Sequence, residues 1–444
     1  MPSIELRMKA WFGDEPLNLT FPDSWRVVDL GPPDEPGLTQ EQMRDRFTRP
    51  IGAAPLWQSA KGKRRVAIVV DDLTRPTPAA DVLPLLVADL RRAGIAETAI
   101  TVFVAGGTHP PDSGDAVVKK VGAQIAATLR VVPHDCHGEL ADLGTSPAGL
   151  PVKINRLFME CDLKIGIGCL YPHPFAGFSG GAKIVLPGLC GAETTRMMHD
   201  YVRGARARGG SIHTEVRRDM VAIARRAGLE FIVNVTLNRH RAISGLFAGD
   251  VEQAFESGVQ AARQLYRVAS PPRADVVVAD MYPFDGSWQF AQDRGLWPLE
   301  RTGAGTSKVV IAACPQGVGN HELFPVASPL WSRLARRLRH LGPSDLSRPV
   351  EKIQTILALM RRKREPLLVM APGLQANDVT RIFPRARWFR EWNDLAAVLR
   401  ERHGEGPRTV AVYRCAPLLL ADGSDRAEAS AAVDSVPAPA ADQA

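Results

Sequence analysis

Short runs of aliphatic and β-branched residues alternate along this chain with segments that repeat at a helical period. Such runs, separated by helices, are typical of strands buried on both faces of a parallel sheet. The sequence therefore predicts an α/β fold with mainly parallel sheets, in which ligands bind at the carboxyl ends of the strands. The predicted strands lie at 65–70, 100–105, 162–168, 231–237, 275–279, 308–313, 366–370 and 408–413, and the predicted helices include 79–93 and 251–268.

The length of 444 residues exceeds what one hydrophobic core usually organises and predicts two α/β domains. A Ser-Pro-Pro sequence at 270–272 follows a long helix and precedes a strand, so we place the boundary there. The N-terminal domain then spans 1–270 and the C-terminal domain spans 273–421. Residues 422–444 are rich in Ala, Pro, Ser and Asp, which predicts a disordered tail.

Composition limits the kind of partner to expect. No apolar run approaches the roughly 20 residues that cross a bilayer, and the N-terminus lacks the apolar core of a signal peptide. We therefore expect a cytoplasmic protein with no membrane partner. The six cysteines form no CxxC pair, which favours reduced thiols. The net charge of +7 comes largely from arginines on predicted helices such as 216–228 and 330–341, and aromatic residues are only 6%, which favours small anions over nucleic acid.

Polar groups follow the first two predicted strands. Asp72, Thr74 and Arg75 come directly after the strand at 65–70, and Arg75 can bind a carboxylate or phosphate through two parallel hydrogen bonds. The spacing leaves open that Asp72 only caps a turn and that Arg75 lies on the surface. The second strand leads into two glycines and His109, a placement that favours a functional histidine over a structural one.

The stretch 171–199 combines His173, Lys183 and His199 with several glycines. Gly180 and Gly181 would let the backbone approach a phosphate or a flat ring closely, while the lysine brings a positive charge. This combination indicates a bound, charged cofactor.

Two familiar motifs fit this stretch poorly. Ser179 stands in a G-x-S-x-G pattern, but a nucleophile elbow must follow its strand directly, and the predicted strand ends near Gly168. Lys183 lacks the G-K-[ST] context of a phosphate loop. The segment 134–137, with two histidines, an aspartate and a cysteine, lacks a second ligand pair at zinc spacing.

Taken together, these motifs resemble the nickel-pincer-nucleotide lactate racemase family. The chain contains, in the order and approximate spacing of the family, DDLTRPTP at 71–78, GGTHPP at 106–111, HPFAGFSGGAKIVLPG at 173–188, His199, and YPFDGSWQ at 282–289. Together, these motifs are far more specific for the family than any one of them alone.

The resemblance implies a nickel-pincer nucleotide, a nicotinic-acid-derived mononucleotide whose two thio groups and one ring carbon hold nickel. His199 matches the fourth nickel ligand, and Lys183 is either a covalent anchor or a charge partner of this cofactor. Asp72, Thr74, Gly180 and Gly181 are the further residues expected to bind it. Separate biosynthetic enzymes would be needed to make it, and cofactor and substrate would lie in the cleft between the two domains.

The resemblance also implies a mechanism. His109 and His173 match the family's two acid-base histidines, which act on opposite faces of a 2-hydroxy acid, and Arg75 would hold the substrate carboxylate. The α-hydride moves to the cofactor and back, so that a 2-keto acid forms and the centre inverts. The chain is thus expected to be an isomerase, a racemase or epimerase of a 2-hydroxy acid.

One region departs from the family. The lactate enzyme contacts its substrate with a tyrosine, a glutamine and a lysine, where this chain has Trp288, Gln289 and Gln292. Loss of the positive charge suggests a larger or less charged substrate than lactate, unless Arg294 compensates. Two other classes stay open on sequence grounds: a serine hydrolase that uses Ser179, and a protein that only binds the nickel cofactor or a hydroxy acid.

Overall fold

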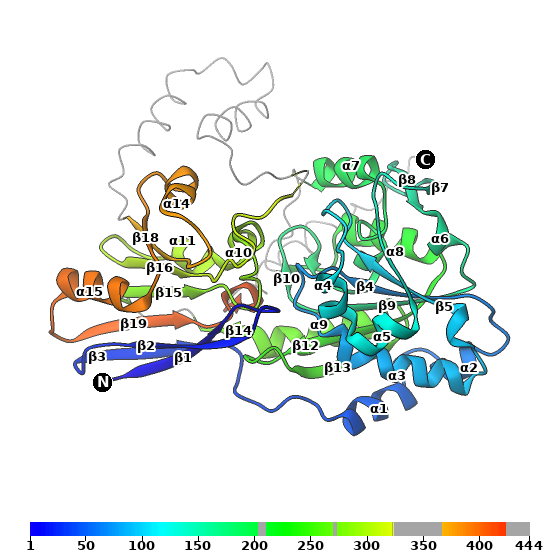
Figure 1. Cartoon of the computed structure of the whole chain (residues 1–444), viewed down its shortest axis with the longest axis horizontal. Helices are drawn as coiled ribbons and strands as arrows, with labels where there is room; N and C mark the ends of the chain where they lie inside the picture. Colours follow the sequence, from blue (N-terminus) through cyan, green and yellow to red (C-terminus); the bar gives the residue numbers. More distant parts are fainter. Residues whose placement is uncertain (203–209, 270–272, 322, 324–365, 423–444) are drawn as a thin grey trace, which may run out of the picture. The chain divides into compact units, whose positions relative to one another are not determined.

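The computed structural model describes residues 1–202, 210–269, 273–321, 323 and 366–422 (Figure 1). The chain divides into two compact units. Unit 1 consists of Met1–Leu30 and Pro271–Ala416, and unit 2 consists of Gly31–Ser270 and Pro417–Ala444.

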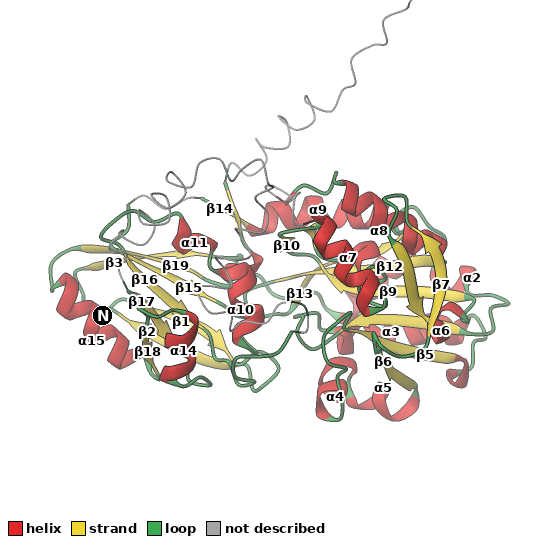
Figure 2. Ribbon diagram, turned by 90° about the horizontal axis from the view of Figure 1, so that it is seen from above, coloured by secondary structure: helices red, strands yellow, loops and turns green. Residues whose placement is uncertain are grey.

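Unit 2 is built on a six-stranded sheet in the order β13-β12-β9-β4-β5-β6. All its strands are parallel except β13, which pairs antiparallel with β12 at one edge. Every residue of β4 and β9 is buried, as expected where helices cover both faces of a sheet. In Figure 2, helices of unit 2 lie on either side of its yellow strands. The strands are β4 (Val66–Asp71), β5 (Ile100–Ala105), β6 (Arg130–Pro133), β9 (Leu163–Cys169), β12 (Leu229–Leu237) and β13 (Ile243–Gly249).

Shorter strands and helices complete unit 2. The two-stranded pairs are β7 (Leu140–Thr145) with β8 (Pro151–Asn155), β10 (Pro172–His173) with β11 (Gly177–Phe178), and β14 (Arg267–Val268) with β20 (Leu420–Ala421). The helices are α1 (Gln40–Thr48), α2 (Leu56–Ser59), α3 (Ala79–Arg92), η1 (Glu97–Ala99), α4 (Asp115–Val121), α5 (Ala123–Thr128), α6 (Arg156–Met159), η2 (Gly181–Ile184), α7 (Ala192–Val202), α8 (Glu215–Arg226) and α9 (Gln253–Tyr266).

The strand order of unit 2 contains a switch point. From β4 the chain continues to β5 and β6 on one side, and then returns to β9 on the other side of β4. The connections that leave β4 and β9 therefore diverge, and in open parallel sheets ligands bind in the crevice at such a point. The loop after β4 carries Asp72 and Arg75, and the segment after β9 leads to Lys183.

Unit 1 holds a second six-stranded sheet, in the order β18-β17-β16-β15-β19-β3, and all its strands are parallel. Its strands are β3 (Trp25–Leu30), β15 (Val276–Asp280), β16 (Ser307–Ile311), β17 (Leu367–Met370), β18 (Arg387–Phe389) and β19 (Arg408–Tyr413). Beside them are the antiparallel pair β1 (Ser3–Met8) and β2 (Glu15–Thr20), and the helices α10 (Trp288–Gly295), α11 (Trp297–Glu300), α14 (Ala376–Ile382) and α15 (Trp392–His403). The short helix η5 (Ala416–Leu418) lies at the boundary between the two units.

The predicted α/β class with mainly parallel sheets is confirmed, and the two sheets contain all the predicted strands. All six cysteines are buried, and none of them forms a disulfide bond. None of the helices in the described part of the chain is both long and apolar enough to cross a membrane.

The predicted domain boundaries differ from the division into units. Residues 1–30 were expected in the N-terminal domain, yet β3 pairs with β19 in the sheet of unit 1, where the blue β3 lies beside the orange β19 (Figure 1). At the other end, β20 pairs with β14 of unit 2. The junction 270–272, the helix expected at 330–341 and the tail from 423 lie outside the described residues. The cleft between domains stays a prediction.

Candidate functional site

The loop after β4 and the loop after β5 meet through a buried hydrogen-bond chain. His109 Nδ1 lies 2.6 Å from Asp72 Oδ2, and both side chains are buried. The Thr74 hydroxyl donates to the other carboxylate oxygen of Asp72 at 2.7 Å, and Arg75 Nη1 donates to Thr74 Oγ1 at 2.9 Å. The structure thus brings together all four residues that the sequence placed after these two strands.

The Asp72 carboxylate sets the protonation of His109. Burial alone would raise the pKa of Asp72, but the facing His109, Arg75 and Thr74 groups outweigh burial and hold that pKa well below its usual range. An ionised carboxylate only accepts hydrogen bonds, so Nδ1 of His109 carries a proton and Nε2 is left as the basic nitrogen. Burial lowers the pKa of His109 despite Asp72, and the positive charges of Arg75 and Lys183 lower it further. The ring is therefore a neutral base near pH 7.

A second carboxylate, which the sequence did not single out, stands next to this pair. Asp112 Oδ2 accepts the backbone N–H of Leu73 at 2.8 Å. Burial, followed by repulsion from the Asp72 carboxylate, raises the pKa of Asp112 to about 6. Asp112 therefore anchors the loop after β4 at the residue next to Asp72. The only hint in the sequence was its position shortly after His109.

His173 lies in the short strand β10, whose partner β11 turns back within a few residues. Its Nδ1 accepts the backbone N–H groups of Phe175 and Ala176, each at 3.3 Å. Nδ1 therefore lacks a proton, and the neutral ring carries its proton on Nε2. The two predicted acid-base histidines are thus held in opposite tautomers.

The glycine-rich loop after β11 is fixed by a buried arginine that sequence analysis placed on a solvated helix face. Arg217, on α8, donates to the carbonyls of Ala176 at 2.9 Å and Gly180 at 3.1 Å, and also to that of Phe178. It is 4% exposed, and burial lowers its pKa to about 9. Burying a cation is costly, so these three carbonyls are what stabilises it there. The helical period could not reveal that these carbonyls were its partners.

Gly180 is required at its position. Its φ of +84° lies in the left-handed region, and a Cβ there would meet Asn234 Oδ1 at 2.5 Å. The same Asn234 oxygen accepts the N–H of Gly181 at 3.0 Å. The backbone before Lys183 is thus held against β12 by a buried amide that the sequence did not indicate.

The segment that carries Lys183 returns to the loop after β5. Lys183 lies in η2, and the N–H of Gly107 donates to the carbonyl of Gly188 at 2.9 Å. The electrostatic effect of Lys183 on the pKa of His109 agrees with this closeness. The predicted cofactor anchor and one predicted acid-base histidine therefore belong to one neighbourhood of unit 2.

His199 lies on α7 in an orientation suited to metal binding. Its Nδ1 lies 2.7 Å from the carbonyl oxygen of Thr195, one turn earlier on the helix. A carbonyl oxygen can only accept a hydrogen bond, so Nδ1 carries the proton. Nε2 therefore carries the lone pair, the arrangement usual for histidine ligands whose other nitrogen is held by a carbonyl. The ring of Phe175 stands between those of His173 and His199, with its centroid 6.0 Å from each.

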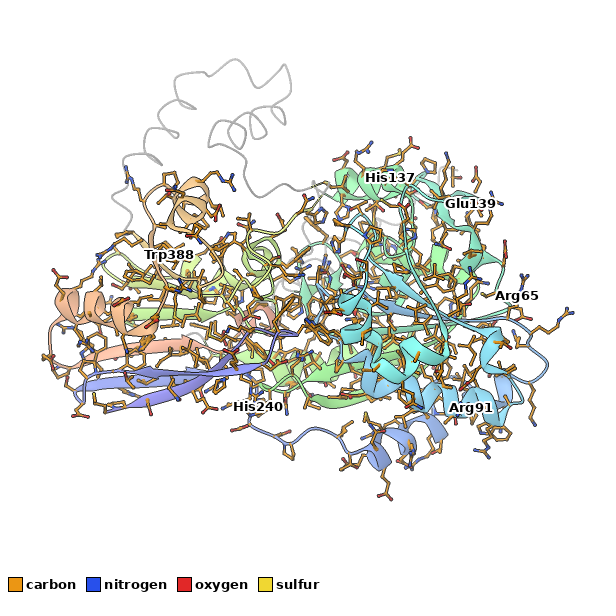
Figure 3. The ribbon with its side chains drawn as sticks, in the orientation of Figure 1. Arg65, Arg91, His137, Glu139, His240 and Trp388 are labelled. Atoms are coloured by element: carbon orange, nitrogen blue, oxygen red, sulfur yellow. The ribbon has the colours of Figure 1, made fainter. Side chains whose placement is uncertain are left out.

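The other histidines singled out in the sequence have protein partners or lie at the surface. His134 is buried, where Nε2 donates to the carbonyl of Cys190 at 3.0 Å and Nδ1 accepts from Asn155 at 3.2 Å. His137 is exposed and lies at the outside of unit 2 (Figure 3). No group of three or more His, Cys, Asp or Glu side chains in the described residues could hold a metal ion.

Ser179 is not placed as a nucleophile elbow. It is 6% exposed and follows the two-residue strand β11 instead of a strand of the main sheet. Its N–H donates to the carbonyl of Tyr171 at 2.9 Å. Within the residues that the structure describes, no hydrogen bond joins the Ser179 hydroxyl to a histidine, and this geometry gives the hydrolase reading no support.

The predicted substrate contacts of the C-terminal part belong to unit 1, on or beside α10. Trp288 Nε1 donates to Gln292 Oε1 at 3.2 Å, so the two residues that depart from the family pattern bond to each other. The Trp288 ring packs edge-on against Phe383 at 5.8 Å, and Gln289 is 1% exposed. Their role in substrate binding stays a prediction.

Comparisons with known proteins show which family the chain resembles. Residues 12–210 match the family model described as the lactate racemase N-terminal domain. The lactate racemase of Lactiplantibacillus plantarum is 33% identical over 304 residues, which cover 65% of this chain and 70% of that protein. The lactate racemase of Thermoanaerobacterium thermosaccharolyticum is 31% identical over 296 residues, which cover 65% of this chain and 69% of that protein.

Solved structures show the same fold. The lactate racemase apoprotein from Thermoanaerobacterium thermosaccharolyticum superposes with a TM-score of 0.71 at 24% identity, over 95% of this chain and all (100%) of that chain. A Thermotoga maritima protein superposes with a TM-score of 0.59 at 16% identity, over 87% of this chain and 98% of that chain. The curated relatives are isomerases, and the similarity places this chain in that class of enzyme. It belongs to the lactate racemase family, as the sequence motifs indicated.

Proposed function

We propose that the protein racemises or epimerises a 2-hydroxy acid by reversible hydride transfer through a 2-keto acid, with a nickel-pincer nucleotide as cofactor. The observation that carries the proposal is the buried pair of Asp72 and His109 beside Arg75. It combines a base of fixed tautomer with a guanidinium suited to a carboxylate, the two groups that a 2-hydroxy acid requires.

In this mechanism Arg75 binds the substrate carboxylate, and Nε2 of His109 takes the hydroxyl proton of one enantiomer. His173, once protonated, gives a proton to the oxygen when the opposite face is reduced, and both rings then exchange protons with water. To act as the base for the other enantiomer, His173 must adopt its other tautomer. That tautomer and the protonated ring both carry a proton on Nδ1, so each sacrifices two long hydrogen bonds of 3.3 Å, each worth only about 0.5–1 kcal/mol.

The chain's own residues fit the cofactor. Nε2 of His199 would bind the nickel, since the Thr195 carbonyl holds the proton on Nδ1. Lys183 would form the covalent anchor or pair with the cofactor's charge, and the backbone at Gly180 and Gly181 would allow its close approach. When bound, this group would accept and return the α-hydride. Cofactor-building enzymes are partners that the proposal requires.

We propose as substrate a 2-hydroxy acid that is larger or less charged than lactate. Lactate is the substrate that the names of the two relatives give. If Trp288, Gln289 and Gln292 contact it, they offer an indole and amides and no cation. Neutral groups of this kind suit a substrate whose distal part is apolar or uncharged.

Exchange of the substrate's α-hydrogen tests the proposal. Protein co-expressed with the cofactor-building enzymes is given a panel of 2-hydroxy acids deuterated at the α-carbon, and both enantiomers are followed by chiral chromatography and mass spectrometry. We expect inversion with the wild type, and losses of about 10²–10⁴-fold in His109→Ala and His173→Ala. Full activity in both variants would overturn the acid-base assignment.

A second measurement tests cofactor binding independently of the reaction. Intact mass and nickel content are compared between the wild type and Lys183→Ala. An adduct of nucleotide mass that depends on Lys183 supports the tether, and nickel without an adduct supports untethered binding. Absence of both from correctly folded protein would remove the nickel nucleotide from the proposal.

A further inference from the structure

The most deeply buried cation of the described residues lies close to the loop that carries Arg75. The Lys120 side chain, on α4, is 0% exposed. Its Nζ lies 2.5 Å from Asp71 Oδ1 and donates to the backbone carbonyls of Arg75 at 3.0 Å and Thr77 at 3.1 Å. Three oxygens of one loop thus surround one ammonium group.

This arrangement closes the loop 71–77 on itself. Two backbone carbonyls accept hydrogen bonds from the ammonium, and the Asp71 carboxylate forms an ion pair with it. The second oxygen of Asp71 accepts the Thr77 hydroxyl at 2.5 Å, which joins the first residue of the loop to the last. A charge buried without such partners would be costly, so the loop and Lys120 stabilise each other.

Arg75 is therefore held from two sides. Its carbonyl is fixed by Lys120, and its guanidinium donates to Thr74 Oγ1 at 2.9 Å. Lys120 itself belongs to the helix that follows the His109 loop, so it links that segment to the loop after β4.

We propose that Lys120 is a positioning residue, which holds the backbone of Arg75 so that its guanidinium meets the substrate carboxylate. The proposal rests on the function proposed above for Arg75. A small misplacement of a binding group can cost a large factor in its contribution, because the productive geometry is narrow.

The test compares Lys120→Met with Lys119→Met in cofactor-loaded protein. Lys119 is the exposed neighbour on the same helix, which makes it a matched control for loss of a positive charge. For α-hydrogen exchange we expect KM to rise about tenfold or more in Lys120→Met, with kcat changed by less than about threefold, and no change in Lys119→Met. A merely structural role would lower the amount of folded enzyme and leave its KM unchanged.

A second variant separates positioning from the cost of an unpaired carboxylate. In Asp71→Asn/Lys120→Met the buried charge of Asp71 is also removed. If the raised KM persists in the double variant, the lost hydrogen bonds to the Arg75 and Thr77 carbonyls are responsible, as proposed. If the double variant recovers the wild-type KM, the effect came from Asp71 alone and the proposal is wrong.

Hydrogen exchange of the backbone gives a readout that does not depend on turnover. In the protein without cofactor, amides of a peptide that spans 71–78 should exchange about tenfold faster in Lys120→Met than in Lys119→Met, because the loop opens more often. Unchanged exchange together with unchanged KM would overturn the proposal. If the wild type inverts no hydroxy acid, the proposed function fails, whereas this exchange comparison still decides whether Lys120 holds the loop.

Discussion

Asp72 determines which nitrogen of His109 can act as a base. The 2.6 Å contact keeps the proton on Nδ1, and burial keeps the ring neutral despite the adjacent carboxylate. The same residue also orders Thr74 and through it Arg75. Loss of this one carboxylate should therefore alter both the rate and the pH dependence of the proposed reaction.

Asp72→Asn tests this point. Asp72 raises the pKa of His109, so its removal should lower that pKa further. A depressed pKa means that the basic form persists as the pH falls, and the acid limb of kcat/KM should lie below the ordinary pKa of about 6.5 and move to still lower pH in the variant. We expect kcat to fall about a hundredfold because the tautomer is no longer fixed. The measurement is the pH profile of α-hydrogen exchange, and an acid limb that moves to higher pH would contradict the assignment.

His199→Ala tests the metal ligand. We expect nickel measured by mass spectrometry to fall from about one atom per chain to almost none, with little change in the stability of the cofactor-free protein, because His199 is only half-buried. His213→Ala is the control, since His213 is an exposed histidine of the same unit. Equal nickel in His199→Ala and the wild type would exclude His199 as the ligand.

At the residue scale, sequence analysis singled out the groups proposed to react but missed the residues that hold them in place. Asp72, Arg75 and His109 were recognisable because they follow buried strands directly. Lys120 and Arg217 lie on helices, where a cation normally indicates a solvated face, and both are buried because their partners are backbone carbonyls of loops. A carbonyl has no sequence signature, so this part of the site could not be predicted.

At the scale of elements, the loop from β11 to η2 depends on backbone conformations that only glycine adopts easily. Arg217 holds its carbonyls and Asn234 holds the N–H of Gly181, so contacts within the protein itself fix the loop. A preformed loop binds its ligand without a further cost in conformational entropy.

Gly180→Ala, compared with Gly149→Ala, tests this rigidity. Both glycines have positive φ, +84° and +81°, but a Cβ at Gly149 meets nothing within 4 Å. We expect Gly149→Ala to cost about 1 kcal/mol of unfolding free energy, for backbone strain alone. Gly180→Ala should cost at least about 2 kcal/mol more, because its Cβ overlaps Asn234. Urea unfolding of the cofactor-free protein measures both, and equal losses would contradict the steric argument.

The strands themselves were predictable because continuous aliphatic runs leave few alternatives. The prediction for 100–105 matches β5, and that for 408–413 matches β19, residue for residue. The N-terminal β3 was not predicted, because its partner lies at the opposite end of the chain and most of its residues are partly buried or exposed, whereas every residue of β4 is buried. Pairing between such distant segments leaves no local pattern.

At the scale of the whole molecule, residues 1–30 are part of the core of unit 1. Leu6, Leu19, Phe21 and Trp25 are each at most 2% exposed and pack with β15, β16 and β19. Their removal would expose β19 as a new sheet edge. Unit 1 thus depends on two segments from opposite ends of the sequence.

Deletion of residues 1–30 should unfold unit 1 and spare unit 2. Truncating one large core residue costs about 2–5 kcal/mol, and the loss of four exceeds the stability of most domains. Limited proteolysis with mass spectrometry should show rapid cleavage within 273–416 and protection of peptides from 66–169, which serve as the internal control. Equal protection of both regions would show that β3 is dispensable.

The position of β3 also has a consequence for the order of events during protein synthesis. The first thirty residues leave the ribosome long before β19 exists to receive them, while nearly all of unit 2 is made in between. Several of those residues are large and apolar, and the core they join is complete only once β19 has been made. Nascent chains of this protein are therefore expected to need protection of their N-terminus by a chaperone, and to be more prone to aggregate when elongation is slow.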